Sequence, residues 1–418
     1  MVNLKQLQSL TLRLRLPATT GALALAIAFV LTVVTTIAAH AQSFQVIYAF
    51  TGGTDGGQPY SGVTLNSGGD LFGTTHTGNQ GTNWGQVYEL QYSGSSYTFF
   101  DLHLFDGAIE APAVFGPNGT LYSASPNNLT LYHHGYVLNV SPPTAPVCYN
   151  MLCLWDGNVL YGFSGGADGD TPNYGALIFD RVGNMYGTTS AGGSGNGVVY
   201  ELMGSGINWT EQALYSFSGS GDGATPFSGV IFDNAGNLYG TTTAGGASGN
   251  GAVYELSPSG SGWTEHVIYS FTGGSDGSYP TAGLIFDASG NLYGSTNKGG
   301  TSGGGTVFEL SPSGGGWTYS LLHSLTGGAN CGPWASLTLK GGNLYGATVC
   351  DGTSSAGNVF ELSPSGNGWT YSSLYDFSGG NDGKFPYGSV TFDSAGNLYG
   401  TTLRGGTYLQ GVVWKITP

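Results

Sequence analysis

The sequence predicts an all-β fold, a seven-bladed β-propeller of four-stranded antiparallel blades, on three observations. First, a Leu-Tyr-Gly type of unit recurs with a period of about 53 residues, which is typical of repeat architectures. Second, each clear repeat holds four strand-like runs. Third, the two ends of the chain match complementary parts of one repeat. The aromatic residues of the unit are Phe72, Tyr122, Tyr186, Tyr239, Tyr293, Tyr345 and Tyr399.

The repeat over residues 226–279 shows the four expected strands in order, and we name them A to D. They are residues 228–233 (SGVIFD), 237–243 (NLYGTTT), 251–257 (GAVYELS) and 263–271 (WTEHVIYSF). Each run is rich in Val, Ile, Tyr, Phe or Thr and is bounded by Gly, Asn, Asp or Pro, as antiparallel strands and their turns are. No helical periodicity follows the first 41 residues.

The chain ends predict how the ring closes. Residues 44–53 (FQVIYAFTGG) match strand D alone, and residues 411–418 (GVVWKITP) match strand C. We therefore expect the N-terminal strand to complete the last blade, which removes an unpaired sheet edge. The unit is eroded over residues 95–160, where we expect an irregular blade.

Residues 1–41 are predicted to be a signal peptide, and residues 42–418 the propeller. A basic start precedes an apolar run over 21–39 and an A-x-A site that places cleavage between Ala41 and Gln42. Because the run has about 19 residues, a retained N-terminal membrane anchor stays open as an alternative. The protein is expected to be exported, as a secreted or cell-surface protein.

Export also predicts that the four cysteines form two disulfides. We expect pairing within repeats, Cys331 with Cys350 and Cys148 with Cys153, although three connectivities are open.

Charge and composition exclude several classes of protein. After the signal, six Lys or Arg face 24 Asp or Glu, a formal net charge of −18. Such a balance argues against nucleic acid or an anionic membrane surface as partner. Gly supplies 76 of 418 residues, too many for helices, while 13% aromatic residues argue against disorder.

Four segments carry a family resemblance: GNLYGTT (236–242), TAGGASGNG (243–251), VYELSPSG (253–260) and FTGGSDG (271–277). In this order they make the repeats similar to the GloVer-type, or choice-of-anchor, tandem repeat family of exported proteins, over about residues 44–418. The resemblance implies a propeller-like fold and an exported address. It implies no activity and no catalytic residue.

Residues that recur in most blades are expected to be structural. Asp-Gly pairs in the loops between blades suit tight turns, although an oxygen-rich loop also suits a polar ligand or Ca²⁺. These aspartates are Asp55, Asp168, Asp222, Asp276 and Asp382. The Glu that recurs in strand C, as at Glu201, is expected to be hydrogen-bonded between blades.

Residues that break the repeat are better candidates for binding. After strand B most blades have small residues, but His76, Lys298 and Arg404 intrude. If the loops converge at the mouth of the funnel, these side chains supply donors and positive charge on an acidic protein. That suits a polar or acidic ligand such as a glycan. The alternative is that they are solvated loop side chains.

We predict a monomeric, noncatalytic binding module for extracellular carbohydrate or a cell-surface polymer, acting through the loop-lined funnel face. A protein-interaction scaffold or adhesin, with a surface protein as partner, is an alternative. A glycoside hydrolase or polysaccharide lyase is a second alternative and requires two axial carboxylates in one pocket. The acids to inspect are Asp101, Glu110, Asp156, Asp170, Asp351 and Asp376. No cofactor and no metal are predicted, with Ca²⁺ left open.

Overall fold

The computed structural model describes residues 42–418 except 79–83, 127–130, 144–147, 150, 151, 154, 173 and 367. The described residues form one compact unit. The predicted signal peptide, including Ala41, lies outside the described residues. Within the described part of the chain, no helix has the length and apolar character needed to span a membrane.

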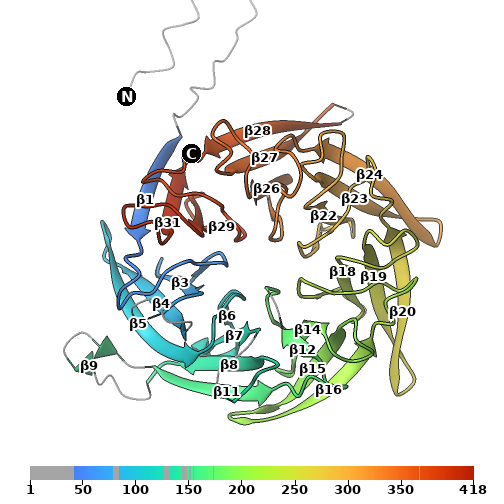
Figure 1. The fold of residues 1–418 in the computed structure, drawn as a ribbon, viewed down its shortest axis with the longest axis horizontal. Coiled ribbons are helices and arrows are strands. Elements are labelled where there is room, and N and C mark those ends of the chain that lie inside the picture. The colour runs from blue at the N-terminus through green and yellow to red at the C-terminus, as the bar shows by residue number, and fades with distance from the viewer. Residues whose placement is uncertain are drawn as a thin grey trace, which may run out of the picture. The chain divides into compact units, whose positions relative to one another are not determined.

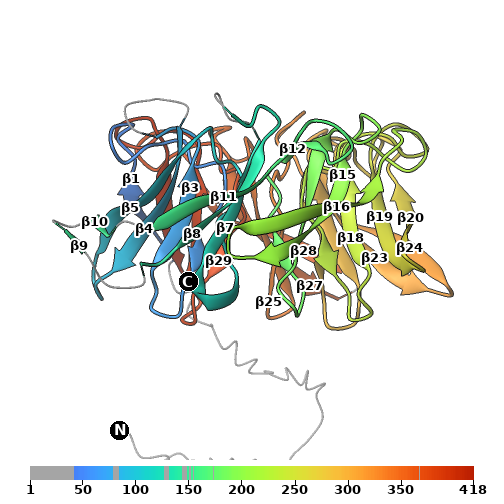
Figure 2. The same cartoon turned by 90° about the horizontal axis from the view of Figure 1, so that it is seen from below.

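Seven antiparallel sheets stand around a central axis, as the sequence predicts (Figures 1 and 2). Blades 1 and 2 consist of β2 Thr64–Leu65, β3 Leu71–Thr75, β4 Trp84–Tyr92 and β5 Tyr97–Asp106, then β6 Val114–Phe115, β7 Leu121–Ser125, β8 Tyr136–Ser141 and β11 Asp156–Gly162. Blade 3 consists of β13 Ile178–Phe179, β14 Met185–Ala191, β15 Val198–Ser205 and β16 Asn208–Ser216, with β12 Asp170–Pro172 added beside β14.

The later blades follow the repeat more regularly. Blades 4 and 5 consist of β17 Ile231–Phe232, β18 Leu238–Thr242, β19 Ala252–Ser259 and β20 Gly262–Ser270, then β21 Ile285–Phe286, β22 Leu292–Thr296, β23 Thr306–Ser313 and β24 Gly316–Ser324. Blades 6 and 7 consist of β25 Thr338–Lys340, β26 Asn343–Thr348, β27 Asn358–Ser365 and β28 Gly368–Asp376, then β29 Thr391–Phe392, β30 Leu398–Thr402, β31 Val412–Thr417 and β1 Ser43–Ala49.

The ring closes between the two ends of the described chain. Strand β1 pairs antiparallel with β31, from Ser43 opposite Thr417 to Ala49 opposite Val412. Figure 1 shows the blue N-terminal strand beside the dark red last blade. The predicted closure is confirmed, and its reason is that β31 would otherwise present an unpaired edge.

The Gly of the Leu-Tyr-Gly unit makes room for an aromatic ring on the neighbouring strand. Gly240 is paired with Tyr254, and a Cβ added to Gly240 would lie 2.4 Å from the hydroxyl oxygen of this fully buried tyrosine. The same pairing recurs as Gly73–Tyr88, Gly187–Tyr200, Gly294–Phe308, Gly346–Phe360 and Gly400–Trp414. In blade 2 both partners differ, because Ser123 is opposite Leu138.

The hydrophobic core lies between neighbouring blades. One cluster packs Tyr239 and Val253 of blade 4 against Leu292 and Phe308 of blade 5, all at most 6% exposed. Related clusters join the other blades, so each sheet buries both faces against its neighbours. Large aromatic rings fill the space because adjacent blades diverge from the axis.

The A strands approach one another closely near the axis. A Cβ added to Gly388 would lie 2.2 Å from the backbone nitrogen of Gly62, and a Cβ added to Gly62 would lie 2.2 Å from the carbonyl oxygen of Ser389. Only very small residues allow backbones this close. Six blades accordingly carry small pairs here: Ser61–Gly62, Gly175–Ala176, Ser228–Gly229, Ala282–Gly283, Ala335–Ser336 and Gly388–Ser389.

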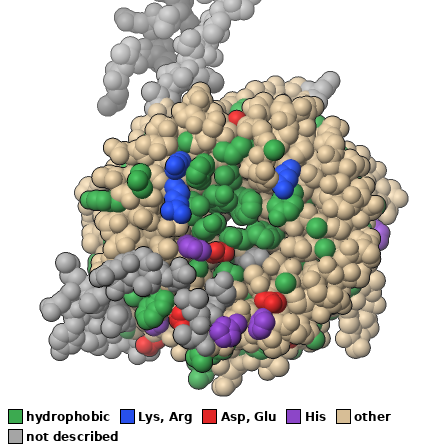
Figure 3. All heavy atoms as spheres, viewed as in Figure 1, with side chains coloured by type: hydrophobic (Ala, Val, Ile, Leu, Met, Phe, Trp, Pro, Cys, Tyr) green, Lys and Arg blue, Asp and Glu red, His purple; other side chains and the backbone are tan. Residues whose placement is uncertain are grey.

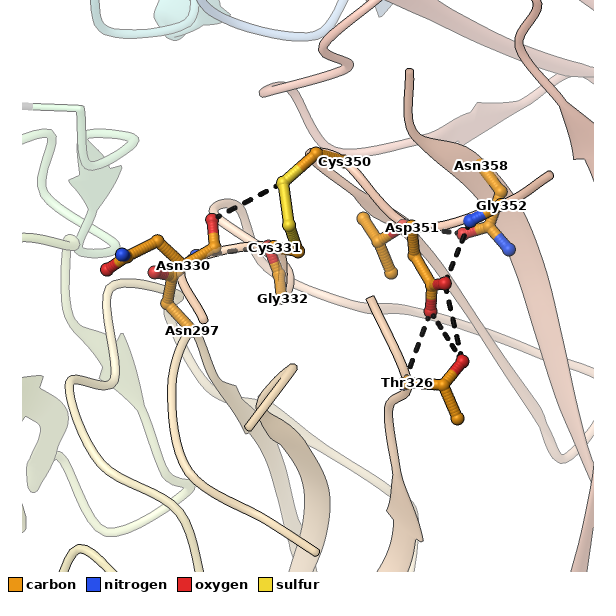
Figure 4. Close-up of a disulfide and its surroundings, with 10 residues drawn as sticks. Asn297, Thr326, Asn330, Cys331, Gly332, Cys350, Asp351, Gly352 and Asn358 are labelled. Atoms are coloured by element: carbon orange, nitrogen blue, oxygen red, sulfur yellow. Dashed lines mark hydrogen bonds between the residues drawn. A yellow bond between two sulfur atoms is a disulfide. The ribbon is translucent and has the colours of Figure 1, made fainter. Parts of the chain in front are cut away.

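A disulfide joins Cys331 to Cys350 across two loops of blade 6, as predicted (Figure 4). Beside it, Asp351 accepts a hydrogen bond from the hydroxyl of Thr326. For the second predicted pair, the backbones of Cys148 and Cys153 are partners in the short hairpin of β9 Cys148–Tyr149 and β10 Leu152–Cys153. The side chains of this pair lie outside what the structure describes. The hairpin belongs to the region where an irregular blade was expected.

The recurrent Glu of strand C is bonded within its own blade at Glu201, Glu255, Glu309 and Glu361, so the prediction of bonds between blades is wrong at these positions. Glu201 Oε1 accepts hydrogen bonds from the Tyr186 hydroxyl and the Asn184 amide, each at 2.8 Å. The reason is the register: Tyr186 stands directly opposite Glu201 in the sheet, and side chains of directly opposite residues meet on the same face.

Candidate functional site

The loops between blades and the loops after strand B lie on the same face, as the sequence predicts. In blade 5, Ser278 and Lys298 exchange two backbone hydrogen bonds of 2.8 and 3.1 Å. In blade 7, Lys384 and Arg404 do the same. The face that carries these loops is named the funnel face.

Residues in left-handed backbone conformation fasten neighbouring blades on the funnel face. Tyr279 has φ 57°, and its N–H donates to the carbonyl of Asn250 in the preceding blade at 3.0 Å. Phe385, with φ 60°, donates in the same way to Ala356. Bulky residues rarely adopt this conformation, so the surrounding contacts impose it. The ammonium group of Lys298 lies 4.1 Å from the centroid of the Tyr279 ring.

Five aromatic side chains meet at the axis of the funnel face. They form the axial aromatic platform: Tyr60, Tyr174, Phe227, Trp334 and Tyr387. Ring centroids lie 4.7 Å apart for Tyr174 and Phe227, 5.2 Å apart for Trp334 and Tyr387, and 5.3 Å apart for Tyr60 and Tyr387. All five side chains are partly exposed.

The platform residues come from matching positions of five blades. Each stands at the start of strand A, three residues before the first apolar residue that enters the sheet, as Tyr60 stands before Val63. Glu110 holds this position in blade 2 and Thr281 holds it in blade 5. Aromatic side chains are therefore projected toward the axis from five directions, and the two polar residues complete the ring.

A cavity of about 130 Å³ lies on the axis, and every blade contributes to its lining. Tyr60, Tyr174, Trp334 and Tyr387 line it together with the small residues of the A strands. Pockets that enclose a drug-sized ligand measure roughly 300–1,000 Å³, so this cavity is too small to hold an extended ligand. Figure 3 shows hydrophobic side chains filling the centre of one face, with Lys or Arg side chains in two places beside them.

A histidine–carboxylate pair stands at one edge of the platform. His76 Nδ1 lies 2.9 Å from Glu110 Oε1, and the His76 ring lies 5.3 Å from the Tyr60 ring. Burial raises the pKa of Tyr174, and the Glu110 carboxylate beside it raises that pKa further. The pKa of Tyr60 is also raised, by burial and by the charge of Glu110, and the Arg404 charge offsets part of this rise. The Tyr60 hydroxyl is thus influenced by the negative charge of a carboxylate and by the positive charge of a guanidinium.

The three residues singled out from the sequence occupy two kinds of position. His76 faces the axis and contacts the platform. Lys298 and Arg404 stand one position further along the equivalent loops of blades 5 and 7. The structure therefore brings His76 to the axial site directly and places the two cations in its surrounding loops. A fourth residue, Lys384, which sequence reasoning missed, is the backbone partner of Arg404.

The recurrent aspartates hold the turns between blades. Asp276 accepts hydrogen bonds from the backbone N–H of Thr272 at 2.8 Å and from the Tyr269 hydroxyl at 3.0 Å. Burial acts to raise the Asp276 pKa, but the hydrogen bonds from Thr272 outweigh it and leave that pKa lowered. The same two contacts recur at Asp55, Asp168, Asp222 and Asp382.

Carboxylates and metal ligands are sparse at the axis. Glu110 is the single acid among the described residues that line the cavity, whereas hydrolysis by a carboxylate pair needs two facing one substrate. In the part of the chain that the structure describes, no three His, Cys, Asp or Glu side chains lie close enough together to hold a metal ion.

The platform could have been found by comparing the repeats at one position. The residue that opens strand A is aromatic in five of the seven blades, which is unusual beside the small residues that follow it. The platform is not among the residues that break the repeat, because an aromatic that recurs looks structural.

Comparison with known proteins supports the repeat assignment. The sequence profile of the family described as Gloeobacter/Verrucomicrobia repeat matches residues 156–332 and 264–418. No curated protein matches the sequence. Among solved structures, the chain is similar to a Thermus thermophilus protein provisionally described as an oxidoreductase (glucose dehydrogenase). That match has 15% identity and a TM-score of 0.44, and it covers 72% of this chain and 94% of the other.

Proposed function

The chain belongs to the Gloeobacter/Verrucomicrobia repeat family, and we propose that it is an exported, noncatalytic module that binds carbohydrate on its funnel face. The axial aromatic platform is the observation that carries the proposal. Sugar rings present apolar C–H faces and hydroxyl edges, and aromatic rings bordered by polar groups complement both.

Three features support a sugar as the occupant. The platform is partly exposed, so ring surface is available to a ligand. The His76–Glu110 pair stands beside the platform and offers a ring nitrogen and carboxylate oxygens for hydroxyl groups. The small axial cavity favours a ligand that lies across the platform, such as a polysaccharide chain, over one that is enclosed.

The disulfide of blade 6 supports the proposed export of the protein. Disulfides persist in oxidising compartments outside the cytosol, and Cys331 and Cys350 form one. The predicted signal peptide supplies the route.

Removal of platform rings tests the proposal. The full chain is screened against immobilised neutral and acidic polysaccharides, and the affinity for the best oligosaccharide is measured by calorimetry. Trp334→Ala and Tyr387→Ala should each weaken binding by about tenfold or more, because a central buried aromatic typically contributes about 2 kcal/mol. Tyr387→Phe keeps the ring and should change the affinity by less than about threefold.

Tyr92→Ala serves as the matched control. Tyr92 is 40% exposed and ends strand C, at the end of the blade away from the loops of the funnel face. Its removal should leave binding unchanged. Equal losses in Tyr92→Ala and Trp334→Ala, or no loss in either platform variant, would reject the funnel face as the binding site.

A further inference from the structure

One pair position recurs on the funnel face, and its occupants differ between blades. At this position, one residue lies in the loop that connects two blades and the other lies in the loop that follows strand B. Two backbone hydrogen bonds join them. The pairs are Gly57–Thr77, Ala224–Ala244, Ser278–Lys298 and Lys384–Arg404. In blade 6 the disulfide Cys331–Cys350 stands at the same place, with Cα atoms 4.6 Å apart.

Two cations at such a position repel each other. Residues directly opposite in an antiparallel bridge point their side chains to the same side, and like charges there are destabilising. Among the described residues, neither Lys384 nor Arg404 has a carboxylate within ion-pair distance. Lys384 instead has its ammonium group 5.2 Å from the centroid of the Phe385 ring. Residues 42–418 have a formal net charge of −18. Two neighbouring cations without a carboxylate partner are therefore exceptional in this protein.

The loop that carries Arg404 departs from its equivalents in a second way. Tyr408 and Leu409 are 54% and 65% exposed. Leu409 has φ 63°, where the matching positions of blades 4 and 5 are Gly249 and Gly303. A left-handed conformation costs a side-chain-bearing residue roughly 1–2 kcal/mol. Blade 7 therefore replaces a relaxed Gly-rich loop with a strained one, which exposes an aromatic and an aliphatic side chain in the loop that carries Arg404.

The cationic pair adjoins the axial aromatic platform. Lys384 lies three residues before Tyr387, the platform residue of blade 7, and the Tyr387 ring lies 5.3 Å from the Tyr60 ring. In keeping with this, the Arg404 charge offsets part of the rise that burial and Glu110 cause in the pKa of Tyr60. On the other side of Tyr60 stands the His76–Glu110 pair. The site thus has a cationic end in blade 7 and an acidic end in blade 2.

We propose that Lys384 and Arg404 form an anion subsite that selects acidic saccharides, bonding the carboxylate or sulfate group of a sugar whose ring lies on the platform. The inference rests on the proposed function and adds the substrate class to it. An anion relieves the repulsion between the two cations, and the planar guanidinium bonds a carboxylate or sulfate through two parallel N–H groups.

The experiment compares an acidic ligand with its ester, in which a methyl group replaces the negative charge of each sugar. Binding of tetragalacturonic acid and of its neutral methyl ester to the full-length chain is measured by calorimetry at low and at physiological salt. A sulfated tetrasaccharide of the same length tells a sulfate preference from a carboxylate preference. We expect the acid to bind about tenfold more tightly than the ester, and we expect this advantage to shrink as salt rises.

Variants locate the preference. Lys384→Gln with Arg404→Gln should bring the acid to the affinity of the ester while leaving binding of the ester unchanged. Arg404→Lys should keep part of the preference, since it keeps the charge but not the paired donors. Lys340→Gln is the control, because Lys340 lies in the A–B hairpin over Phe392.

The outcomes separate this inference from the proposed function. Equal affinity of wild-type protein for acid, sulfated sugar and ester overturns the anion subsite and keeps carbohydrate binding. A preference for the anionic sugars that survives the double substitution also overturns the subsite, since other groups then cause it. Failure of all three ligands, together with no hit among other polysaccharides, overturns both proposals.

Discussion

Substitution of Gly240 by Ala is expected to destabilise the propeller, although the change adds only one methyl group. The added Cβ would lie 2.4 Å from the hydroxyl oxygen and 2.6 Å from Cζ of Tyr254, which is fully buried. Non-bonded carbon atoms in van der Waals contact lie about 3.5–4.0 Å apart, so the ring or the strand must move by about 1 Å. Overpacking of this kind costs about 1–3 kcal/mol. The matched control is Gly262→Ala, since a Cβ at Gly262 meets nothing within 4 Å.

A double substitution tests the steric reason. Tyr254→Leu alone should cost about 1–2 kcal/mol through lost burial, but together with Gly240→Ala the cost should fall below the sum by about 1 kcal/mol or more. Blade 2 supports this, because its Ser123 faces Leu138. The free energy of unfolding is measured by urea denaturation followed by tryptophan fluorescence. Additive costs, or a Gly240→Ala variant as stable as Gly262→Ala, would refute the explanation of the repeat's signature glycine.

Three further predictions concern pH, the disulfide and export. Burial, reinforced by a neighbouring aspartate in each case, raises the pKa values of Glu211 and Glu265 to about 7 from 4.5. These groups therefore stabilise the folded state below about pH 4.5, and this contribution is lost as pH rises toward 7. Glu211→Gln with Glu265→Gln should raise the melting temperature at pH 8 but not at pH 4, and an equal rise at both would contradict the assignment. The Cys331→Ser, Cys350→Ser variant should lose about 3 kcal/mol, the entropy of closing a loop of about 20 residues, in urea unfolding; an unchanged midpoint would count against it. N-terminal sequencing of the exported protein should begin at Gln42, whereas an intact start at Met1 would indicate a retained anchor.

The fold was predictable because its signal is repeated and local. The Leu-Tyr-Gly unit places a Tyr, a Gly and a cross-strand aromatic in fixed register, as at Gly240 and Tyr254, and each copy reinforces the others. The closure by β1 followed from an unmatched strand at each end. The hydrogen-bond partners of Glu201 were not predictable without the strand register. A Glu side chain is long enough to bond within its own sheet or to the next one, and only the register places Tyr186 opposite Glu201.

The candidate site was predictable only in part. His76 and Arg404 stood out because they interrupt a run of small residues. The platform did not, because its successive members lie between 53 and 114 residues apart and meet only when the ring closes. Lys384 stood out only when its backbone pairing with Arg404 was visible, since an isolated Lys in a loop is ordinarily a solvated side chain.

The most direct measurement for the binding proposal is a crystal structure of the protein with the oligosaccharide that it binds best. We expect a sugar ring stacked on Trp334 or Tyr387 on the funnel face, with its acidic group at Lys384 and Arg404. A sugar bound at the outer edges of the blades, with no sugar on the platform, would contradict the proposed binding site.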